Sequence, residues 1–255
     1  MLVYPNQRWY KFDLTTTWNL SPYMLCMLGA MLKDKYEIKI VDAQFYNMSE
    51  EQFKKEVEEF LPDCVGISVL SSEYASILDT TAAIVKEVDK SIITIAGGVH
   101  VTTQYYRVLE NKDIDYAIRG EGEYVLRDFL AYLNGEGAFP EKGVVFRNGN
   151  EIINALPLDL VQDLDSLPLT NYDLVDYPAY ANTGPRYGVD SVHIYPYARL
   201  LTSRGCPTGC SFCQVESISG KKWRMRSAEK VVDELTFLKE KYGIKAFIFE
   251  DDNPF

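Results

Sequence analysis

The chain has 255 residues, enough for two domains or one large domain, and 47% of them are hydrophobic, so it can bury a core. Its formal net charge is −11 and lysine and arginine form no long run, so we do not expect nucleic acid as a partner. It has no apolar run long enough to span a membrane and no basic signal-peptide region, so we expect a cytoplasmic protein without a membrane partner.

Short apolar segments alternate with amphipathic ones over the first half of the chain. Ser49 and Gln52 form a capping box at the start of one expected helix, and apolar periodicity predicts helices over 80–88 and 124–133. Ser21 is expected to cap an earlier helix that has a proline in its first turn. The alternation predicts an α/β fold, a doubly wound parallel sheet of the Rossmann-like type with ligand-binding loops at the carboxyl ends of its strands. The expected strands are 2–4, 37–41, 64–69, 92–96 and 115–118.

The alternation stops near residue 134. Asn148 and Gly149 lie between two apolar runs and predict a β-hairpin over 144–153. Residues 156–188 are rich in proline, aspartate, tyrosine and leucine but show no clear periodicity, so we expect a linker that packs over the surface.

A second α/β alternation begins at residue 198. We expect strands over 198–202 and 245–249, with a helix between them that Ser227 caps and Gly243 ends. The chain is therefore expected to have three parts. They are a Rossmann-like domain over 1–136, a hairpin and linker over 137–193, and the beginning of a second domain over 194–255.

Three of the five cysteines lie within eight residues, in the sequence Cys206-Pro-Thr-Gly-Cys210-Ser-Phe-Cys213. Their odd number and close spacing indicate metal or redox use in a reducing compartment rather than a disulfide framework. Three thiolates in one loop can hold three corners of an iron–sulfur cubane and leave the fourth iron open. The alternatives are three buried cysteines or a zinc site, but structural zinc needs four ligands and His193 is the nearest candidate for the fourth.

This cysteine spacing, with Phe212 before the last cysteine, resembles the radical S-adenosylmethionine (SAM) superfamily. The resemblance implies a [4Fe-4S] cluster on Cys206, Cys210 and Cys213, SAM on the open iron, and a reductant such as flavodoxin or ferredoxin. It also implies that residues 194–255 begin a radical SAM (β/α) barrel. The expected SAM contacts are Phe212, Glu250, Asp251, Asp252 and Asn253, and a solvated acidic turn is the alternative for the last four.

The segment Trp223-Arg224-Met225-Arg226 also resembles the superfamily. Structural packing and the binding of a phosphate-like group are both open as its role.

The amino-terminal region resembles the cobalamin-binding domain that one large subclass of radical SAM enzymes carries. Three segments, Asp42-Ala-Gln44-Phe-Tyr-Asn47, Ser68-Val-Leu70 and Gly97-Gly98, stand where methionine-synthase-type domains have Asp-x-His-x-x-Gly, Ser-x-Leu and Gly-Gly. Because Gln44 replaces the cobalt-ligating histidine, bound cobalamin is expected to lack a protein imidazole ligand. The expected cobalamin contacts are Gln44, Ser68, Leu70, Ser71, Gly97, Gly98, His100, Gly120, Glu121 and Gly122, with His100 in a loop.

The resemblance implies an enzyme that transfers a methyl group to an unactivated carbon by deoxyadenosyl-radical chemistry, on a small-molecule or peptide substrate that the sequence does not identify. A cyclase or another non-methylating cobalamin radical enzyme is one alternative, and a non-catalytic, truncated cobalamin-binding module is another. A relative of the tRNA methylthiotransferases would need further amino-terminal cysteines, whereas Cys26 and Cys64 are isolated. Two expected barrel strands are too few for a closed barrel, so we expect this chain alone to be incomplete and inactive.

Overall fold

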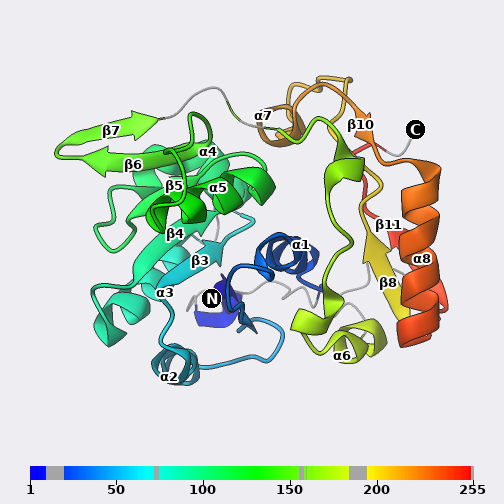
Figure 1. Ribbon diagram of the computed structural model, residues 1–255, viewed down its shortest axis with the longest axis horizontal. Coiled ribbons are helices and arrows are strands. Elements are labelled where there is room, and N and C mark those ends of the chain that lie inside the picture. The colour runs from blue at the N-terminus through cyan, green and yellow to red at the C-terminus, as the bar shows by residue number, and fades with distance from the viewer. Residues whose placement is uncertain (10–19, 72–74, 155–157, 159, 184–193, 254–255) are drawn as a thin grey trace.

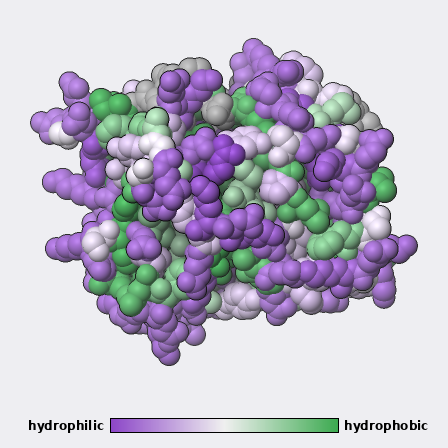
Figure 2. Space-filling model, in the orientation of Figure 1, coloured by the Kyte–Doolittle hydropathy of each residue, from purple (hydrophilic) through white to green (hydrophobic). Residues whose placement is uncertain are grey.

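The computed structural model describes residues 1–9, 20–71, 75–154, 158, 160–183 and 194–253 (Figure 1). These residues form a large open sheet with helices on both faces and, beside it, a smaller unit built on two parallel strands. Among the described residues no helix is long and apolar enough to cross a membrane. Most of the face shown in Figure 2 is hydrophilic, with hydrophobic side chains visible near its centre and its lower left.

The large sheet has seven strands among the described residues, in the order β2-β1-β3-β4-β5-β6-β7. The first five run parallel, and the β6–β7 hairpin joins β5 in antiparallel pairing. The predicted doubly wound parallel sheet is thus confirmed. The strands are β1 Leu2–Tyr4, β2 Ile40–Asp42, β3 Cys64–Ser68, β4 Ile93–Gly97, β5 Tyr116–Ile118, β6 Val144–Asn148 and β7 Glu151–Asn154.

Helices cover both faces of this sheet, and each face has its own apolar core. Helices α1 and α5 bury leucine, valine and phenylalanine side chains against one face, and α2, α3 and α4 pack on the other. The short 3-10 helix η1 (Gln7–Trp9) adds Trp9 to the core under α2, α3 and α4. The helices are α1 Tyr23–Leu32, α2 Glu50–Phe60, α3 Ala75–Val88, α4 Val99–Val108 and α5 Glu123–Leu133.

Two helix starts differ in how well local sequence predicts them. The capping box of α2 is confirmed, because the Gln52 amide donates to Ser49 Oγ over 3.2 Å and the Ser49 amide donates to Gln52 Oε1 over 2.8 Å. The predicted cap at Ser21 is wrong, since Pro22 is the N-cap of α1 and no side chain caps that helix. Ser21 precedes the N-cap, and its buried hydroxyl has no hydrogen-bond partner among the described residues.

Helix α4 was not expected, and its presence corrects the prediction that His100 lies in a loop. His100 is buried in the first turn of α4. The β-branched residues Val99, Val101, Thr102 and Thr103 have low helix propensity, which hid the helix from pattern reading.

The smaller unit pairs β8 with β11 in parallel and β9 with β10 in antiparallel register. Ser227 caps α8 and Gly243 ends it with a φ of 66°, as predicted. The elements are η3 Leu164–Ser166, η4 Tyr172–Leu174, α6 Tyr177–Asn182, β8 Tyr197–Leu200, β9 Ser203–Arg204, α7 Val215–Ser219, β10 Arg224–Met225, α8 Ala228–Tyr242 and β11 Ala246–Phe249.

The segment expected to be an irregular linker contains packed turns in its described part. Tyr172 and Tyr177 are buried in a core that they share with Leu200 and Leu238 of the smaller unit. Tyr180 reaches in the other direction, to β2 of the large sheet. These three tyrosines therefore bind the two units together.

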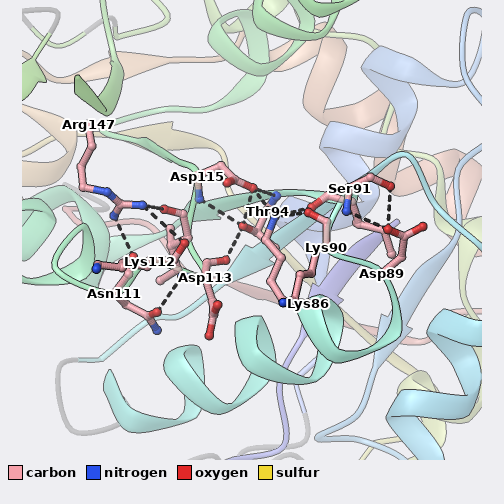
Figure 3. Close-up of polar contacts among 12 residues, drawn as sticks. Lys86, Asp89, Lys90, Ser91, Thr94, Asn111, Lys112, Asp113, Asp115 and Arg147 are labelled. Atoms are coloured by element: carbon pink, nitrogen blue, oxygen red, sulfur yellow. Dashed lines mark hydrogen bonds and ion pairs between the residues drawn. The ribbon is translucent and has the colours of Figure 1, made fainter. Parts of the chain in front are cut away.

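The amino ends of strands β4 and β5 are closed by polar contacts (Figure 3). Arg147 on β6 donates to the carbonyls of Asn111 and Ile114 over 2.8 and 3.1 Å, and also to the carbonyls of Leu109 and Lys112. Beside this group, Asp115 accepts hydrogen bonds from Lys86 Nζ at 2.6 Å and from the Thr94 amide at 2.8 Å. At this end of β4 and β5, these side chains are used in bonds that hold neighbouring turns to the sheet.

Asp42, at the carboxyl end of β2, is a buried carboxyl group. It accepts hydrogen bonds from the Tyr180 hydroxyl and the Phe45 amide, each at 2.8 Å. Burial raises the pKa of Asp42 from 3.8 to about 6, and these hydrogen bonds oppose that rise. The folded state therefore binds this proton more tightly than the unfolded chain does.

We predict that Asp42 makes the protein less stable as pH rises from about 4 to about 6, by about 3 kcal/mol in total. Asp42→Asn cannot titrate, so its free energy of unfolding should lose this part of the pH dependence. Tyr180→Phe should enlarge the total loss and extend it to higher pH, because without this donor the pKa of Asp42 in the folded state rises further. Urea unfolding curves at several pH values would measure both effects. Parallel pH profiles for wild type and Asp42→Asn would contradict the prediction.

Candidate functional site

A cavity of about 350 Å³ lies between the carboxyl end of the large sheet and the smaller unit. The strand order reverses between β1 and β3, and ligands of open α/β sheets bind at such a reversal, outside the carboxyl ends of the strands. Side chains of α1 complete one wall, and residues of β9, α7 and the turn after β11 form the opposite wall. Among the expected cobalamin contacts, Ser68, Leu70, Gly97, Gly98, Gly120, Glu121 and Gly122 line the cavity.

Two adjacent glycines shape the cavity wall at the end of β4. A Cβ added to Gly97 would meet nothing within 4 Å, so the backbone there borders open space. Gly98 has a φ of 98°, and a Cβ there would lie 2.5 Å from the Val69 carbonyl oxygen. Only glycine fits at this second position, and the pair lets a ligand approach the backbone closely.

Three expected cobalamin contacts lie elsewhere. His100 is buried in α4, and Ser71 is outside the wall of the cavity. Gln44 is fully buried in the loop after β2, where its Oε1 accepts the Gln7 amide at 2.8 Å. Its Nε2 has no hydrogen-bond partner among the described residues. The structure therefore brings the strand-end residues together and leaves these three apart from them.

The three clustered cysteines lie on a surface loop between β9 and α7. Cys206 is half-buried, whereas Cys210 and Cys213 are exposed, and Phe212 between them is 87% exposed. The Cys213 amide donates to the Cys210 carbonyl over 3.0 Å, and Gly209 has a φ of 67°. Among the described residues, no three His, Cys, Asp or Glu side chains gather around one metal-ion position. A cubane does not need that arrangement, because each thiolate binds a different iron.

The acidic turn after β11 binds the backbone segment that immediately precedes this loop in the sequence. Asp251 accepts hydrogen bonds from the Thr202 amide at 2.6 Å and the Ser203 amide at 2.9 Å, and Asp252 accepts one from the Gly205 amide at 3.0 Å. Asp252 also lines the cavity. The two flanking residues differ from these aspartates, since Glu250 pairs with Arg199 and Asn253 is half-buried. The aspartates thus set the position from which the cysteine loop starts.

A buried group of four charged side chains joins the two units, and sequence reasoning missed it. Arg204 Nη2 lies 2.6 Å from Glu123 Oε1, and Arg204 Nη1 lies 3.5 Å from Glu121 Oε1. Arg224 donates two hydrogen bonds of 2.8 Å to the two carboxylate oxygens of Glu121. Burial lowers the pKa of Arg204, but Glu123 and Glu121 outweigh that effect and hold it above the ordinary value.

Comparison with known proteins identifies both parts of the chain. Residues 15–130 match the family model described as the B12 binding domain, and residues 200–255 match that of the Radical SAM superfamily. An uncharacterized methyltransferase of Pyrococcus horikoshii is 32% identical over 233 residues, which are 91% of this chain and 48% of that protein. The anaerobic magnesium-protoporphyrin IX monomethyl ester cyclase of Cereibacter sphaeroides is 27% identical over 263 residues, which cover 100% of this chain and 40% of that protein.

Solved structures show the same fold. The radical SAM methyltransferase TsrM of Kitasatospora setae, with tryptophan and a SAM analogue bound, superposes with a TM-score of 0.72 at 20% identity, over 98% of this chain and 47% of that one. The cobalamin-dependent SAM radical enzyme OxsB, with aqua-cobalamin and SAM bound, superposes with a TM-score of 0.76 at 18% identity, over 99% of this chain and 33% of that one. The chain spans about half the length of the curated relatives it matches. By these matches, it belongs to the radical SAM proteins that carry a B12-binding domain.

Proposed function

We propose that this chain is part of an enzyme that transfers a methyl group to an unactivated carbon by cobalamin-dependent radical SAM chemistry. One observation carries the proposal: the cavity of the B12-binding domain is closed on its other side by the base of the cysteine loop. Ser203 and Arg204, just before that loop, and Gly97 and Gly120 of the large sheet border the same space. This arrangement supports a cobalamin site and a cluster site that are adjacent to each other.

The residues of the cysteine loop fit a [4Fe-4S] cluster. Cys206, Cys210 and Cys213 are accessible thiols on one glycine-shaped loop, and thiolates are the ligands that iron–sulfur clusters take. When bound, the cluster supplies the electron that cleaves SAM, and we propose a flavodoxin- or ferredoxin-type reductant as its source. Phe212, Glu250, Asp251, Asp252 and Asn253 stay candidates for SAM contacts.

The cavity fits a cofactor that passes close to the protein backbone. One wall of the cavity is backbone that carries no large side chain, at Gly97, Gly98, Gly120 and Gly122. Ser68 and Leu70, at the end of β3, also line the cavity. Bound cobalamin supplies the methyl carrier of the proposed reaction. Glu121 also lines the cavity, whereas the remaining residues that the sequence indicates lie outside its wall: Ser71, Gln44 and His100.

A radical cyclase is the second candidate function. The magnesium-protoporphyrin ester cyclase of Cereibacter sphaeroides matches along the whole of this chain. The two reactions differ in what becomes of SAM, because a methyl donor leaves S-adenosylhomocysteine whereas radical cleavage alone leaves deoxyadenosine. Incubation of the full-length enzyme with SAM, cobalamin and reductant, followed by chromatography, would separate them. Deoxyadenosine without S-adenosylhomocysteine would reject methyl transfer.

We predict that anaerobic reconstitution loads about four irons per chain, as one [4Fe-4S] cluster requires. Changing Cys206, Cys210 and Cys213 together to alanine should abolish iron binding, because it removes every proposed thiolate ligand. Cys64→Ala is the matched control and should leave iron content unchanged, since Cys64 lies in β3. Colorimetric iron assay and absorbance spectra measure both. Iron that survives the triple change, or tight zinc binding by the wild type, would contradict the cluster.

We predict that Gly97→Leu weakens cobalamin binding about tenfold or more, because the new side chain enters the cavity. The fold should tolerate the change, since a Cβ at Gly97 meets nothing within 4 Å. Gly137→Leu is the matched control, because its Cβ also meets nothing and Gly137 is exposed. Titration followed by corrin absorbance gives the two affinities. Equal affinities would place cobalamin elsewhere.

We predict that the cob(II)alamin form shows no nitrogen splitting from a protein imidazole in electron paramagnetic resonance. Gln44 replaces the expected histidine, and His100 is buried in α4 away from the cavity wall. The spectrum of His100→Ala should therefore match that of the wild type. Splitting that this substitution removes would show that His100 ligates cobalt.

A further inference from the structure

The loop that carries the three cysteines is anchored at both ends by arginines. Arg204, on β9, lies two residues before Cys206, and Arg224, on β10, follows Cys213 by eleven residues. The two strands pair in antiparallel register, with Arg224 opposite Arg204. Both arginine side chains therefore point to the same side of the two-stranded ladder at the base of the loop.

Both arginines bind carboxylates at the start of α5, in the B12-binding domain. Arg204 pairs with Glu123 at 2.6 Å, and Arg224 holds both oxygens of Glu121 at 2.8 Å. Glu123 is 0% exposed and Arg204 is 7% exposed, so water does not compete for these bonds. With two positive and two negative groups the set is neutral, and loss of any one member leaves a buried charge unpaired.

The same segment borders the cavity. Gly120, Glu121 and Gly122 line it from the large sheet, and Arg204 lines it from the other side. A ligand that fills the cavity would therefore contact the backbone that carries one half of the ion group. Charged hydrogen bonds join residues 121 and 123 to Arg204 and Arg224, so they offer a path by which a ligand that orders residues 120–122 would also order these arginines.

The backbone next to Arg204 cannot move freely. Asp251 holds the amides of Thr202 and Ser203, and Asp252 holds the amide of Gly205. On the far side the Cys206 amide donates to the Gly220 carbonyl over 3.2 Å, and Arg224 donates to the Ser219 carbonyl over 2.8 Å. The start and end of the cysteine loop are thus tied by hydrogen bonds to each other and to the backbone beside Arg204.

We propose that Glu121, Glu123, Arg204 and Arg224 form a positioning clamp that fixes the cysteine loop against the cavity and couples occupancy of the cavity to the order of the loop. The clamp rests on the proposed function only for the identity of the occupant. It gives Arg224 of the undecided Trp223–Arg226 segment a role in positioning rather than in phosphate binding.

Hydrogen exchange of the intact chain, with and without hydroxocobalamin, tests the clamp. In the wild type, hydroxocobalamin should slow amide exchange in peptides from 205–223 by about tenfold or more. Glu123→Gln should remove most of this slowing while hydroxocobalamin still binds. The matched control is Glu136→Gln, which alters an exposed pair with Lys35 and should behave as the wild type. Hydroxocobalamin that binds the wild type without protecting residues 205–223 would overturn the clamp.

A double variant separates positioning from simple stabilisation. Glu123→Met with Arg204→Met removes both charges and keeps apolar bulk, so the fold should be retained even if Glu123→Gln unfolds. A clamp predicts that the double variant binds hydroxocobalamin but leaves the cysteine loop unprotected. Wild-type protection in this variant would mean that the ion pair only stabilises the fold, and would reject the proposal.

The test also distinguishes failure of the clamp from failure of the proposed function. If hydroxocobalamin does not bind the wild type, the cobalamin assignment fails. The clamp is then tested by comparing the exchange rates of the two variants without ligand. Exchange in 205–223 that is about tenfold faster in Glu123→Gln than in Glu136→Gln would then support it. Equal rates in the two variants would overturn it.

Discussion

Four charged groups share a volume from which water is nearly excluded, where the first turn of α5 meets β9 and β10. Glu121, Glu123, Arg204 and Arg224 are all buried there. Charges in such a place are tolerated only when they are paired, so the two units cannot slide or rotate without breaking bonds that solvent would not replace. The buried tyrosines 172, 177 and 180 add apolar contact on another side of the same junction. The position of the cysteine loop relative to the large sheet follows from this constraint.

The two ends of the large sheet have opposite properties, and strand direction explains why. At the amino ends, Arg147, Lys86 and Asp115 use their bonding capacity on carbonyls and amides of neighbouring turns (Figure 3). At the carboxyl ends, glycines replace such side chains, and the backbone borders a cavity. Because all parallel strands point the same way, residues that follow β3, β4 and β5 in sequence gather at one edge, next to β9.

Local signals in the sequence predict much of this architecture, whereas contacts between distant segments escape it. The capping box of Ser49 and the Ser227 cap each act within a few residues, so pattern reading finds them. Glu123 and Arg204 lie 81 residues apart, and no local sequence pattern predicts that they pair. Helix α4 and the buried tyrosines of the expected linker depend on packing against other elements, which overrides weak propensity.

The acidic turn after β11 illustrates how one segment can serve both structure and chemistry. Asp251 binds two backbone amides and the Thr202 hydroxyl, which occupy both of its carboxylate oxygens. Asp252 is exposed and borders the cavity, and one of its carboxylate oxygens accepts a hydrogen bond from the Gly205 amide. A carboxylate has about four lone-pair sites, so Asp252 can hold the loop and still accept a cationic amino group from the cavity side. Among the acidic residues proposed to contact SAM, this geometry favours Asp252, with Asp251 holding the backbone beside it.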